Sequence, residues 1–187
     1  RGLEREAGYL RAALADVLSG AVTLREGGDD TPAIRLRVDA QLNIPGAIPS
    51  NAEGYSMTIG PLGVSIVGGD ASGVFYAIQT LRQLMPARQG AAVELPAATI
   101  VDAPLFHHRG LSLDVARHFQ SVETVKKLLD LLSFYKINKF HFHLTDDEGW
   151  RLEIPGIPEL TSYGSRRGFD PAERGMLHPS NGSTGGL

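Results

Sequence analysis

The sequence contains no cysteine, and no run of apolar residues in it approaches the length that crosses a bilayer. The lack of cysteine excludes a disulfide framework, thiol catalysis and thiolate metal sites. A formal net charge of -3, from 18 basic and 21 acidic residues, gives no reason to expect nucleic acid as a partner. With 42% hydrophobic and 21% charged residues, the composition is otherwise that of an ordinary globular protein.

Both ends of the chain lack features that complete proteins have. The chain opens on Arg1-Gly2, without an initiator methionine or the apolar core of a signal peptide. It closes on residues 178–187, HPSNGSTGGL, a Gly/Ser/Asn-rich loop with no helix or strand after it. We therefore expect a processed or trimmed fragment of a longer protein. Export to the periplasm or the medium is the location we favour, with the signal peptide outside this chain.

Residues 1–104 predict a small α+β domain. Apolar residues recur at helical spacing over residues 3–18, and a second helical pattern follows Ser72, a candidate N-cap, and stops at Pro86. Strand-like segments lie at residues 21–25, 34–38, 55–59, 64–67 and 93–100. This order favours helices on one face of a mostly antiparallel sheet. The dipeptide Ala103-Pro104 makes a suitable boundary.

Residues 105–187 begin with a different pattern, a strand, a helix and a second strand. The strands are expected at residues 110–115 and 139–144, and Ser121 is a candidate N-cap for the helix between them. Such a βαβ unit is right-handed in nearly all cases. Two strands cannot bury a core alone, so we expect more βα units to follow in the intact protein.

Polar side chains crowd the end of the second strand. His141 and His143 share one face of it, because side chains alternate along a strand. The opposite face is expected to pack under the helices, and it carries Phe140, Phe142 and Leu144. Three carboxylates follow directly, at Asp146, Asp147 and Glu148. In parallel α/β architectures ligands bind at the carboxyl ends of strands, so this position itself suggests a functional site.

Three kinds of site suit these residues. Two His and two Asp could bind a divalent metal, but an H-x-H pair on a strand is often a structural hydrogen-bonding element, and we expect no metal. A sugar site could use Arg117 and Asp146 to bind hydroxyls and Trp150 to stack on a sugar ring. A buried Arg–Asp network that ties loops together would use the same residues. Spacing alone does not separate the last two alternatives.

The runs RGLSLDVARHF and YKINKFHFHLTDDEGWRLEI closely resemble the start of the catalytic barrel in glycoside hydrolase family 20, the β-N-acetylhexosaminidases. The segment GVSIVGGDASGVFYAIQTLRQLM resembles the end of that family's N-terminal domain. The resemblance implies an α+β accessory domain, residues 1–104, followed by the first βα units of a (β/α)8 barrel, residues 105–187, which is incomplete in this chain. It implies an exo-acting glycosidase that removes terminal β-linked N-acetylglucosamine or N-acetylgalactosamine from an oligosaccharide or glycoconjugate, without a cofactor.

The same resemblance assigns roles to residues of the two runs. Arg117 matches the arginine that grips hydroxyls of the terminal sugar, and Asp146 matches the carboxylate near the active-site histidine network. His143 is expected beside Asp146 in the site. Arg109 is expected to hold the barrel together rather than to touch substrate. Three further residues of the runs are expected in supporting roles, as is His143: Asp114, Asp147 and Trp150.

The catalytic pair of the family is missing from these 187 residues. Family 20 uses a neighbouring Asp–Glu pair on a later strand, in which Glu is the general acid and Asp orients the substrate's 2-acetamido group as the nucleophile, an exception to the usual two-carboxylate scheme. Asp147–Glu148 occupy an earlier loop, and no H-x-G-x-D-E type segment follows. We expect an active parent enzyme, an inactive fragment, and the remainder of the barrel as the fragment's partner. A non-catalytic carbohydrate-binding or interaction fragment is the alternative.

Overall fold

The computed structural model describes residues 2–18, 22–27, 32–45, 52–86 and 93–178. Contacts between residues divide the chain into two compact units, Arg1–His107 and His108–Leu187. The loop expected at the end of the chain lies outside the described residues beyond His178, as does Ala21. Within the described ranges, no helix is long and apolar enough to pass through a membrane.

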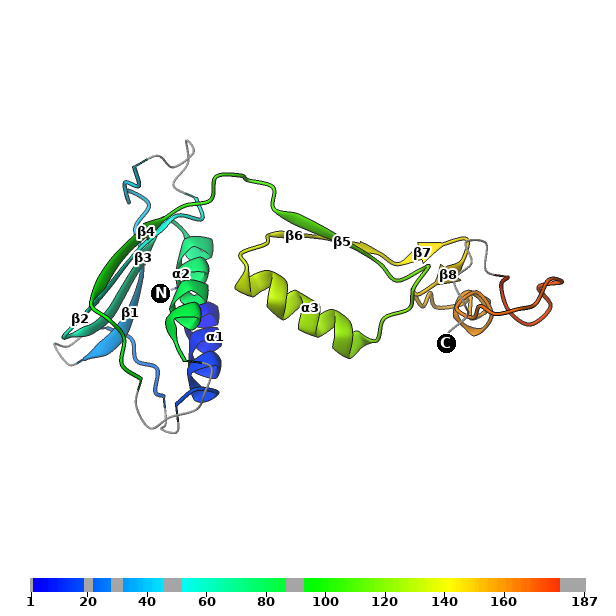
Figure 1. Ribbon diagram of the computed structural model, residues 1–187, viewed down its shortest axis with the longest axis horizontal. Helices are drawn as coiled ribbons and strands as arrows, with labels where there is room; N and C mark the ends of the chain where they lie inside the picture. Colours follow the sequence, from blue (N-terminus) through cyan, green and yellow to red (C-terminus); the bar gives the residue numbers. More distant parts are fainter. Residues whose placement is uncertain (1, 19–21, 28–31, 46–51, 87–92, 179–187) are drawn as a thin grey trace. The chain divides into compact units, whose positions relative to one another are not determined.

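The first unit is built on a mixed sheet, which among the described residues has four strands (Figure 1). These are β1 (Ala33–Val38), β2 (Tyr55–Gly60), β3 (Gly63–Gly68) and β4 (Ala98–Asp102), in the order β1-β3-β2-β4. Strand β2 pairs antiparallel with β3 and β4, and β1 pairs parallel with β3. Helix α2 (Ala71–Leu84) packs on the sheet and α1 (Glu4–Ala15) packs on α2. The expected α+β arrangement with mostly antiparallel pairing is confirmed.

The core of this unit lies between the sheet and the helices. Alternate side chains of β2 and β3 are buried because successive strand residues point to opposite faces. Helix α2 buries residues three and four positions apart, which lie on one helical face. The least exposed apolar side chains of the cluster are Tyr55, Met57, Ile66, Val74, Ala77, Ile78 and Leu81.

The N-cap of α2 differs from the sequence expectation. Asp70 caps the helix, because its Oδ1 accepts a hydrogen bond from the backbone N–H of Gly73 at 2.7 Å. The same oxygen accepts the N–H of Glu53 at 3.1 Å. Ser72 already lies inside the helix, so the prediction of a serine cap was wrong. Asp70 occupies the capping position and reaches a second, distant backbone group that the helical pattern does not reveal.

Two strand predictions for this unit are also corrected. Residues 93–97 are not part of a strand, and β4 begins only at Ala98. Pro96 explains the difference, since proline has no N–H to donate to a neighbouring strand. Residues 22–25 form no strand either.

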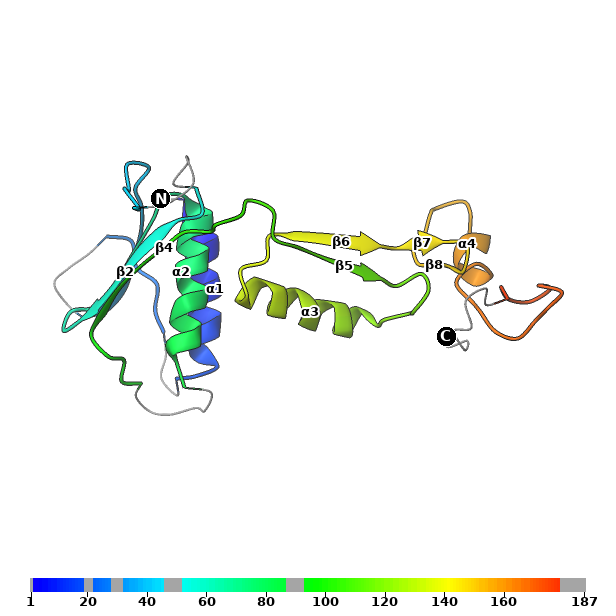
Figure 2. The ribbon, with the colours of Figure 1, turned by 45° about the horizontal axis from the view of Figure 1, so that its top comes forward.

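The second unit contains the expected strand, helix and strand (Figure 2). Strands β5 (Gly110–Asp114) and β6 (Lys139–His143) pair in parallel, and α3 (Val122–Phe134) connects them. Ser121 caps α3 as predicted, with its Oγ accepting the N–H of Thr124 at 3.2 Å. A short hairpin of β7 (Thr145–Asp146) and β8 (Gly149–Trp150) follows, and then α4 (Glu159–Ser162).

Arg109 has a structural role at the start of β5. Its Nε donates to the carbonyl of Lys136 at 2.8 Å, and its backbone N–H donates to Oδ1 of Asn138 at 3.1 Å. The arginine thus ties the start of β5 to the turn that leads into β6.

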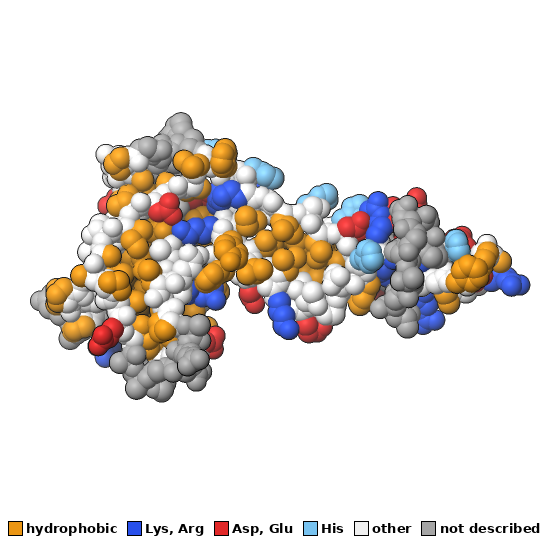
Figure 3. Space-filling model, viewed as in Figure 1, with side chains coloured by type: hydrophobic (Ala, Val, Ile, Leu, Met, Phe, Trp, Pro, Cys, Tyr) orange, Lys and Arg blue, Asp and Glu red, His pale blue; other side chains and the backbone are white. Residues whose placement is uncertain are grey.

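The β5–α3–β6 segment leaves apolar surface open. The rings of Phe140 and Phe142 stack at 5.2 Å on one face of β6, so the predicted alternation with the two histidines is confirmed. Leu111 is 38% exposed and Phe142 is 37% exposed. Figure 3 shows hydrophobic side chains gathered over this segment. Further exposed apolar residues of the helix and its end are Val122, Leu129, Leu131 and Tyr135.

Candidate functional site

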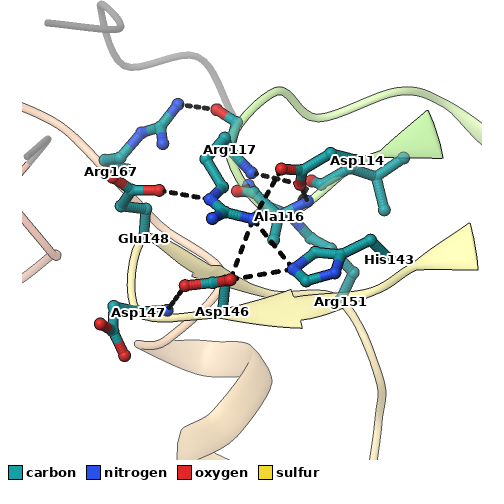
Figure 4. Close-up of polar contacts among 10 residues, drawn as sticks. Asp114, Ala116, Arg117, His143, Asp146, Asp147, Glu148, Arg151 and Arg167 are labelled. Carbon is teal, nitrogen blue, oxygen red and sulfur yellow. Dashed lines mark hydrogen bonds and ion pairs between the residues drawn. The ribbon is translucent and has the colours of Figure 1, made fainter. Parts of the chain in front are cut away.

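Polar side chains from two neighbouring strands meet beyond the carboxyl ends of β5 and β6 (Figure 4). Asp114 ends β5 and Arg117 lies in the turn that follows it. His143 ends β6, and Asp146 lies just beyond it on β7. Because parallel strands end on the same edge, residues distant in sequence come into contact there. Arg117 and Asp146, which the sequence resemblance assigns to one site, form an ion pair at this edge of the two strands, called the rim below.

The Arg117 guanidinium is the centre of this cluster. Its Nη1 lies 2.7 Å from Oδ2 of Asp114 and 2.9 Å from Oδ2 of Asp146. The same atom lies 2.9 Å from Nε2 of His143. On the other side, Nε lies 2.9 Å from Oε2 of Glu148. Three carboxylates therefore surround the Arg117 guanidinium and restrain its position.

The hydrogen atoms of Arg117 and His143 fit one arrangement best. An arginine Nη carries two N–H groups, which Asp114 and Asp146 can both accept. His143 Nε2 also lies 2.9 Å from Oδ2 of Asp146. A protonated Nε2 donates to Asp146, while Arg117 keeps its hydrogen bond to Asp114 and its ion pair with Asp146. We assign the Nε2–H form of His143 on this basis.

Asp114 also shapes the turn that carries Arg117. Its Oδ1 accepts the backbone N–H of Ala116 at 2.9 Å and that of Arg117 at 3.1 Å. An aspartate that bonds its own backbone two and three residues later stabilises a tight turn. Oδ2 of the same carboxylate binds the Arg117 side chain. Asp114 therefore holds both the backbone and the guanidinium of Arg117.

These contacts favour the ionised forms of Asp114 and Asp146. Burial raises the pKa of Asp114, but the N–H groups of Arg117 and Ala116 and the Arg117 charge lower it more, to below its ordinary 3.8. The N–H of Asp147 and the hydrogen bond from His143 hold the pKa of Asp146 below 3.8 as well. For Arg117, burial lowers the pKa, but the three carboxylates raise it more. The site holds a permanent cation among anions.

Glu148 is a member of the cluster that the sequence did not predict. Its side chain is 6% exposed, whereas that of Arg117 is 37% exposed. The guanidinium therefore reaches from a buried carboxylate to the molecular surface. The run of three carboxylates drew attention to Glu148, but spacing gives no sign of which of the three turns inward. Asp147 and Glu148 lie in the turn between β7 and β8, and the path of the chain through this hairpin directs the Glu148 side chain inward.

Asp147 and Trp150 lie outside the cluster. The backbone N–H of Asp147 donates to Oδ1 of Asp146 at 2.8 Å, while its carboxylate points away from Arg117 (Figure 4). The indole N–H of Trp150 donates to the carbonyl of Leu152. Trp150 lines an open cavity of about 450 Å³ together with Phe119. Neither side chain contacts Arg117 among the interactions of the described residues.

The arrangement suits the binding of a polyol. The guanidinium can donate to hydroxyl oxygens, and the carboxylates of Asp114 and Asp146 can accept from hydroxyl groups. All three side chains are partly exposed. In the part of the chain that the structure describes, no group of three or more His, Asp and Glu side chains is placed to hold a metal ion.

Comparison with known proteins connects both units to one family. Residues 1–103 match the model described as glycosyl hydrolase family 20, domain 2, and residues 106–182 match that of glycosyl hydrolase family 20, catalytic domain. The chain is 48% identical over 129 residues to the N,N'-diacetylchitobiase of Vibrio harveyi, covering 69% of this chain and 14% of that protein. It is 38% identical over 178 residues to a β-N-acetylhexosaminidase of Cellulomonas fimi, covering 92% and 34% respectively.

Solved structures give the same result. An exo-β-N-acetylglucosaminidase of Vibrio harveyi, in complex with N-acetylglucosamine, matches with a TM-score of 0.76 at 35% identity, over 91% of this chain and 25% of that one. A β-N-acetylhexosaminidase of Streptomyces coelicolor matches with a TM-score of 0.72 at 36% identity, over 85% and 32%. The chain spans between 14% and 34% of the length of these relatives. On both family models and these relatives, the chain belongs to glycoside hydrolase family 20.

Proposed function

We propose that the protein of which this chain is part is an exo-β-N-acetylhexosaminidase. Its substrates would be oligosaccharides or glycoconjugates that end in β-linked N-acetylglucosamine or N-acetylgalactosamine. The family membership of both units supports this activity, as do relatives named for hexosaminidase or chitobiase activity. Since the chain covers 14% of one relative and 34% of another, the activity is proposed for the whole protein.

Within this chain, Arg117 and Asp146 are the proposed sugar-binding residues. The observation that carries this proposal is the Arg117 guanidinium, held by Asp114, Asp146 and Glu148 yet 37% exposed. A cation fixed in this way donates to sugar hydroxyls without first losing side-chain freedom. His143 and Asp114 support the pair through the hydrogen bonds described above. Asp147 would contribute through its backbone N–H, and Trp150 as an aromatic surface on the same rim.

The chemistry itself would come from outside this chain. The proposed mechanism is substrate-assisted retaining hydrolysis, with a Glu as general acid and an Asp that orients the 2-acetamido group, both on a later barrel strand. No cofactor is required. The division into an accessory domain, residues 1–104, and the start of a (β/α)8 barrel, residues 105–187, is part of the proposal. The partly exposed apolar side chains of Leu111 and Phe142 support it, because further barrel elements would bury them.

The test uses the full-length protein and two chromogenic substrates that differ in one group. The N-acetyl-β-glucosaminide is expected to be hydrolysed with release of the β anomer, which proton NMR detects before mutarotation. The matching β-glucoside, which lacks the acetamido group, is expected to react far more slowly. Equal rates on the two substrates would contradict substrate assistance, and no hydrolysis of either would contradict the proposed activity.

The 187-residue chain provides a second comparison. It contains no Asp–Glu pair in the family's H-x-G-x-D-E pattern, so it is expected to leave the N-acetyl-β-glucosaminide intact. Turnover by this chain at the rate of the full-length protein would show that the catalytic pair lies within it.

A further inference from the structure

Arg151 lies behind the Arg117 cluster and binds the backbone of the turn that carries it (Figure 4). Its Nε donates to the carbonyl of Val115 at 2.9 Å, and its Nη2 donates to the carbonyl of Ala116 at 3.1 Å. Its Nη1 donates to the carbonyl of Ser165. The planar fork of one arginine thus joins the turn after β5 to a loop fifty residues later.

Arg151 and Asp114 act on the same two peptide groups. The carbonyls of Val115 and Ala116 bind Arg151, and the N–H groups of those same peptides, on Ala116 and Arg117, bind Asp114. A peptide group is planar, so holding both of its ends fixes its orientation. Arg117 follows directly after these peptides. The direction in which its side chain leaves the backbone is therefore set from both sides.

Contacts beyond the two peptides restrain the rest of the turn. The Arg151 guanidinium carbon lies 5.4 Å from the ring centroid of Phe119, two residues after Arg117. Arg167, which is 7% exposed, donates from Nη2 to the carbonyl of Arg117 itself. The backbone is held before and at Arg117, and the Phe119 side chain that follows contacts Arg151.

Gly149 allows Arg151 to come this close. A Cβ on Gly149 would lie 2.5 Å from the carbonyl oxygen of Ala116 and 2.8 Å from Nη2 of Arg151. Any side chain at this position would separate the two hydrogen-bonding groups. The lack of a side chain at Gly149 thus allows the Arg151 guanidinium to lie against the turn after β5.

A direct role of Arg151 in ligand binding fits the geometry less well. Arg151 lines the open cavity beside Trp150, but each of its three guanidinium nitrogens already donates to a backbone carbonyl. The Ser165 hydroxyl in the same cavity donates to the carbonyl of Thr161. The polar groups of Arg151 and Ser165 are thus already engaged with the backbone.

We propose that Arg151 is a positioning residue for sugar binding, which acts by orienting the two peptides that precede Arg117 and so aligns the Arg117 guanidinium with Asp146. The role in sugar binding rests on the function proposed above for Arg117. The orientation of the turn does not rest on it, and it can be measured without any substrate.

The first experiment measures the carboxyl pKa of Asp114 by NMR in the full-length protein, without substrate. In Arg151→Met and Arg151→Lys the peptides are free to turn, Asp114 loses N–H donors, and its pKa is expected to rise toward the ordinary 3.8. Lysine retains the charge but lacks the fork that reaches several carbonyls. Arg166→Met is the matched control, since Arg166 is an exposed neighbour whose side chain has no hydrogen bond to the described residues, and it should leave the pKa unchanged.

Both variants are judged by the same signal. If Arg151→Met does not fold, the Arg151→Lys variant decides. A folded Arg151→Lys chain in which Asp114 titrates as in the wild type would overturn the proposal, because a residue that only adds stability would leave this pKa in place.

The second experiment is a double-mutant cycle in the full-length protein. Arg151→Lys is expected to reduce kcat/KM by about tenfold to a hundredfold, as small misplacements of a positioned group do. In the Arg117→Ala background the same change should have almost no further effect, because Arg151 acts through Arg117. An equal loss in both backgrounds would overturn the proposal. If neither Arg117→Ala nor Arg151→Lys alters kcat/KM, the sugar-binding role of Arg117 fails, and the role proposed for Arg151 with it; the Asp114 titration then still reports whether Arg151 orients the turn.

Discussion

Nη1 of Arg117 and Oδ2 of Asp146 lie 2.9 Å apart, although Arg117 follows β5 and Asp146 lies beyond β6. The parallel pairing of the two strands brings Asp114 opposite His143 at their carboxyl ends. Arg117 and Asp146 each lie three residues after a member of this pair. The ion pair is therefore a consequence of strand register, and it links the two loops of the βαβ unit at the point where a ligand would bind.

Replacement of Arg117 tests the sugar site directly. In the full-length protein, Arg117→Ala is expected to lower kcat/KM by an amount equivalent to about 2–4 kcal/mol, because a charged hydrogen bond to the sugar is lost. Steady-state kinetics on a chromogenic N-acetyl-β-glucosaminide measure the effect. Arg11→Ala, a change at an exposed position of α1, is the control. Wild-type kinetics in the Arg117 variant would identify the cluster as a structural network.

The depressed pKa values of Asp114 and Asp146 predict how stability depends on pH. In the unfolded chain both carboxyls titrate near 3.8, and in the folded chain they titrate below that value. Their contribution to the free energy of unfolding is therefore complete above pH 3.8 and is lost as the pH falls through the folded pKa values. Arg117→Gln should be less stable than the wild type at neutral pH, and the difference should shrink in this acidic range.

Trp150 provides the measurement, because it is the single tryptophan of the sequence and lies in the second unit. Its fluorescence during urea unfolding at a series of pH values gives the free energy of unfolding of that unit. Arg11→Gln should follow the wild type throughout. A difference between Arg117→Gln and the wild type that stays constant into strong acid would contradict the prediction.

The N-cap of α2 gives a prediction with a control two residues away. Asp70→Ala removes an acceptor for the N–H groups of Gly73 and Glu53, and is expected to cost about 1–2 kcal/mol of stability. Ser72→Ala should change stability little, because Ser72 lies exposed within the first turn. Amide hydrogen exchange in α2 measures both effects. The opposite order of the two effects would restore the serine as the cap.

Two helical glycines should respond in opposite directions to alanine. A Cβ on Gly73 would lie 2.2 Å from the carbonyl oxygen of Gly54, so Gly73→Ala is expected to destabilise the first unit by about 1–3 kcal/mol. A Cβ on Gly8 in α1 meets no atom within 4 Å. Gly8→Ala should therefore raise stability by about 0.5–1 kcal/mol through helix propensity. Urea unfolding followed by circular dichroism distinguishes the two variants. Destabilisation by both changes would contradict the difference in packing around Gly73 and Gly8.

The local features of the second unit were predictable because they depend on neighbours along the chain. The helix between the two strands, its cap at Ser121 and the alternation along β6 all follow from short-range patterns, and all three are confirmed. The meeting of Arg117 and Asp146 also followed, since parallel strands joined by one helix end at the same edge. Sequence by itself was thus sufficient for the rim of the site.

Only the tertiary structure determined which residues support Arg117 and its turn from behind. Glu148 binds the Arg117 side chain, and Arg151 and Arg167 bind the backbone of its turn. Each contact joins residues far apart in the chain, so no sequence periodicity predicts it. The same reason explains the cap of α2, where Asp70 is selected over Ser72 because its carboxylate reaches both the helix and a distant backbone N–H. Short-range patterns specify helices, strands and strand ends. The partners of a buried charge depend on which loops pack together, and that is settled only when the chain has folded.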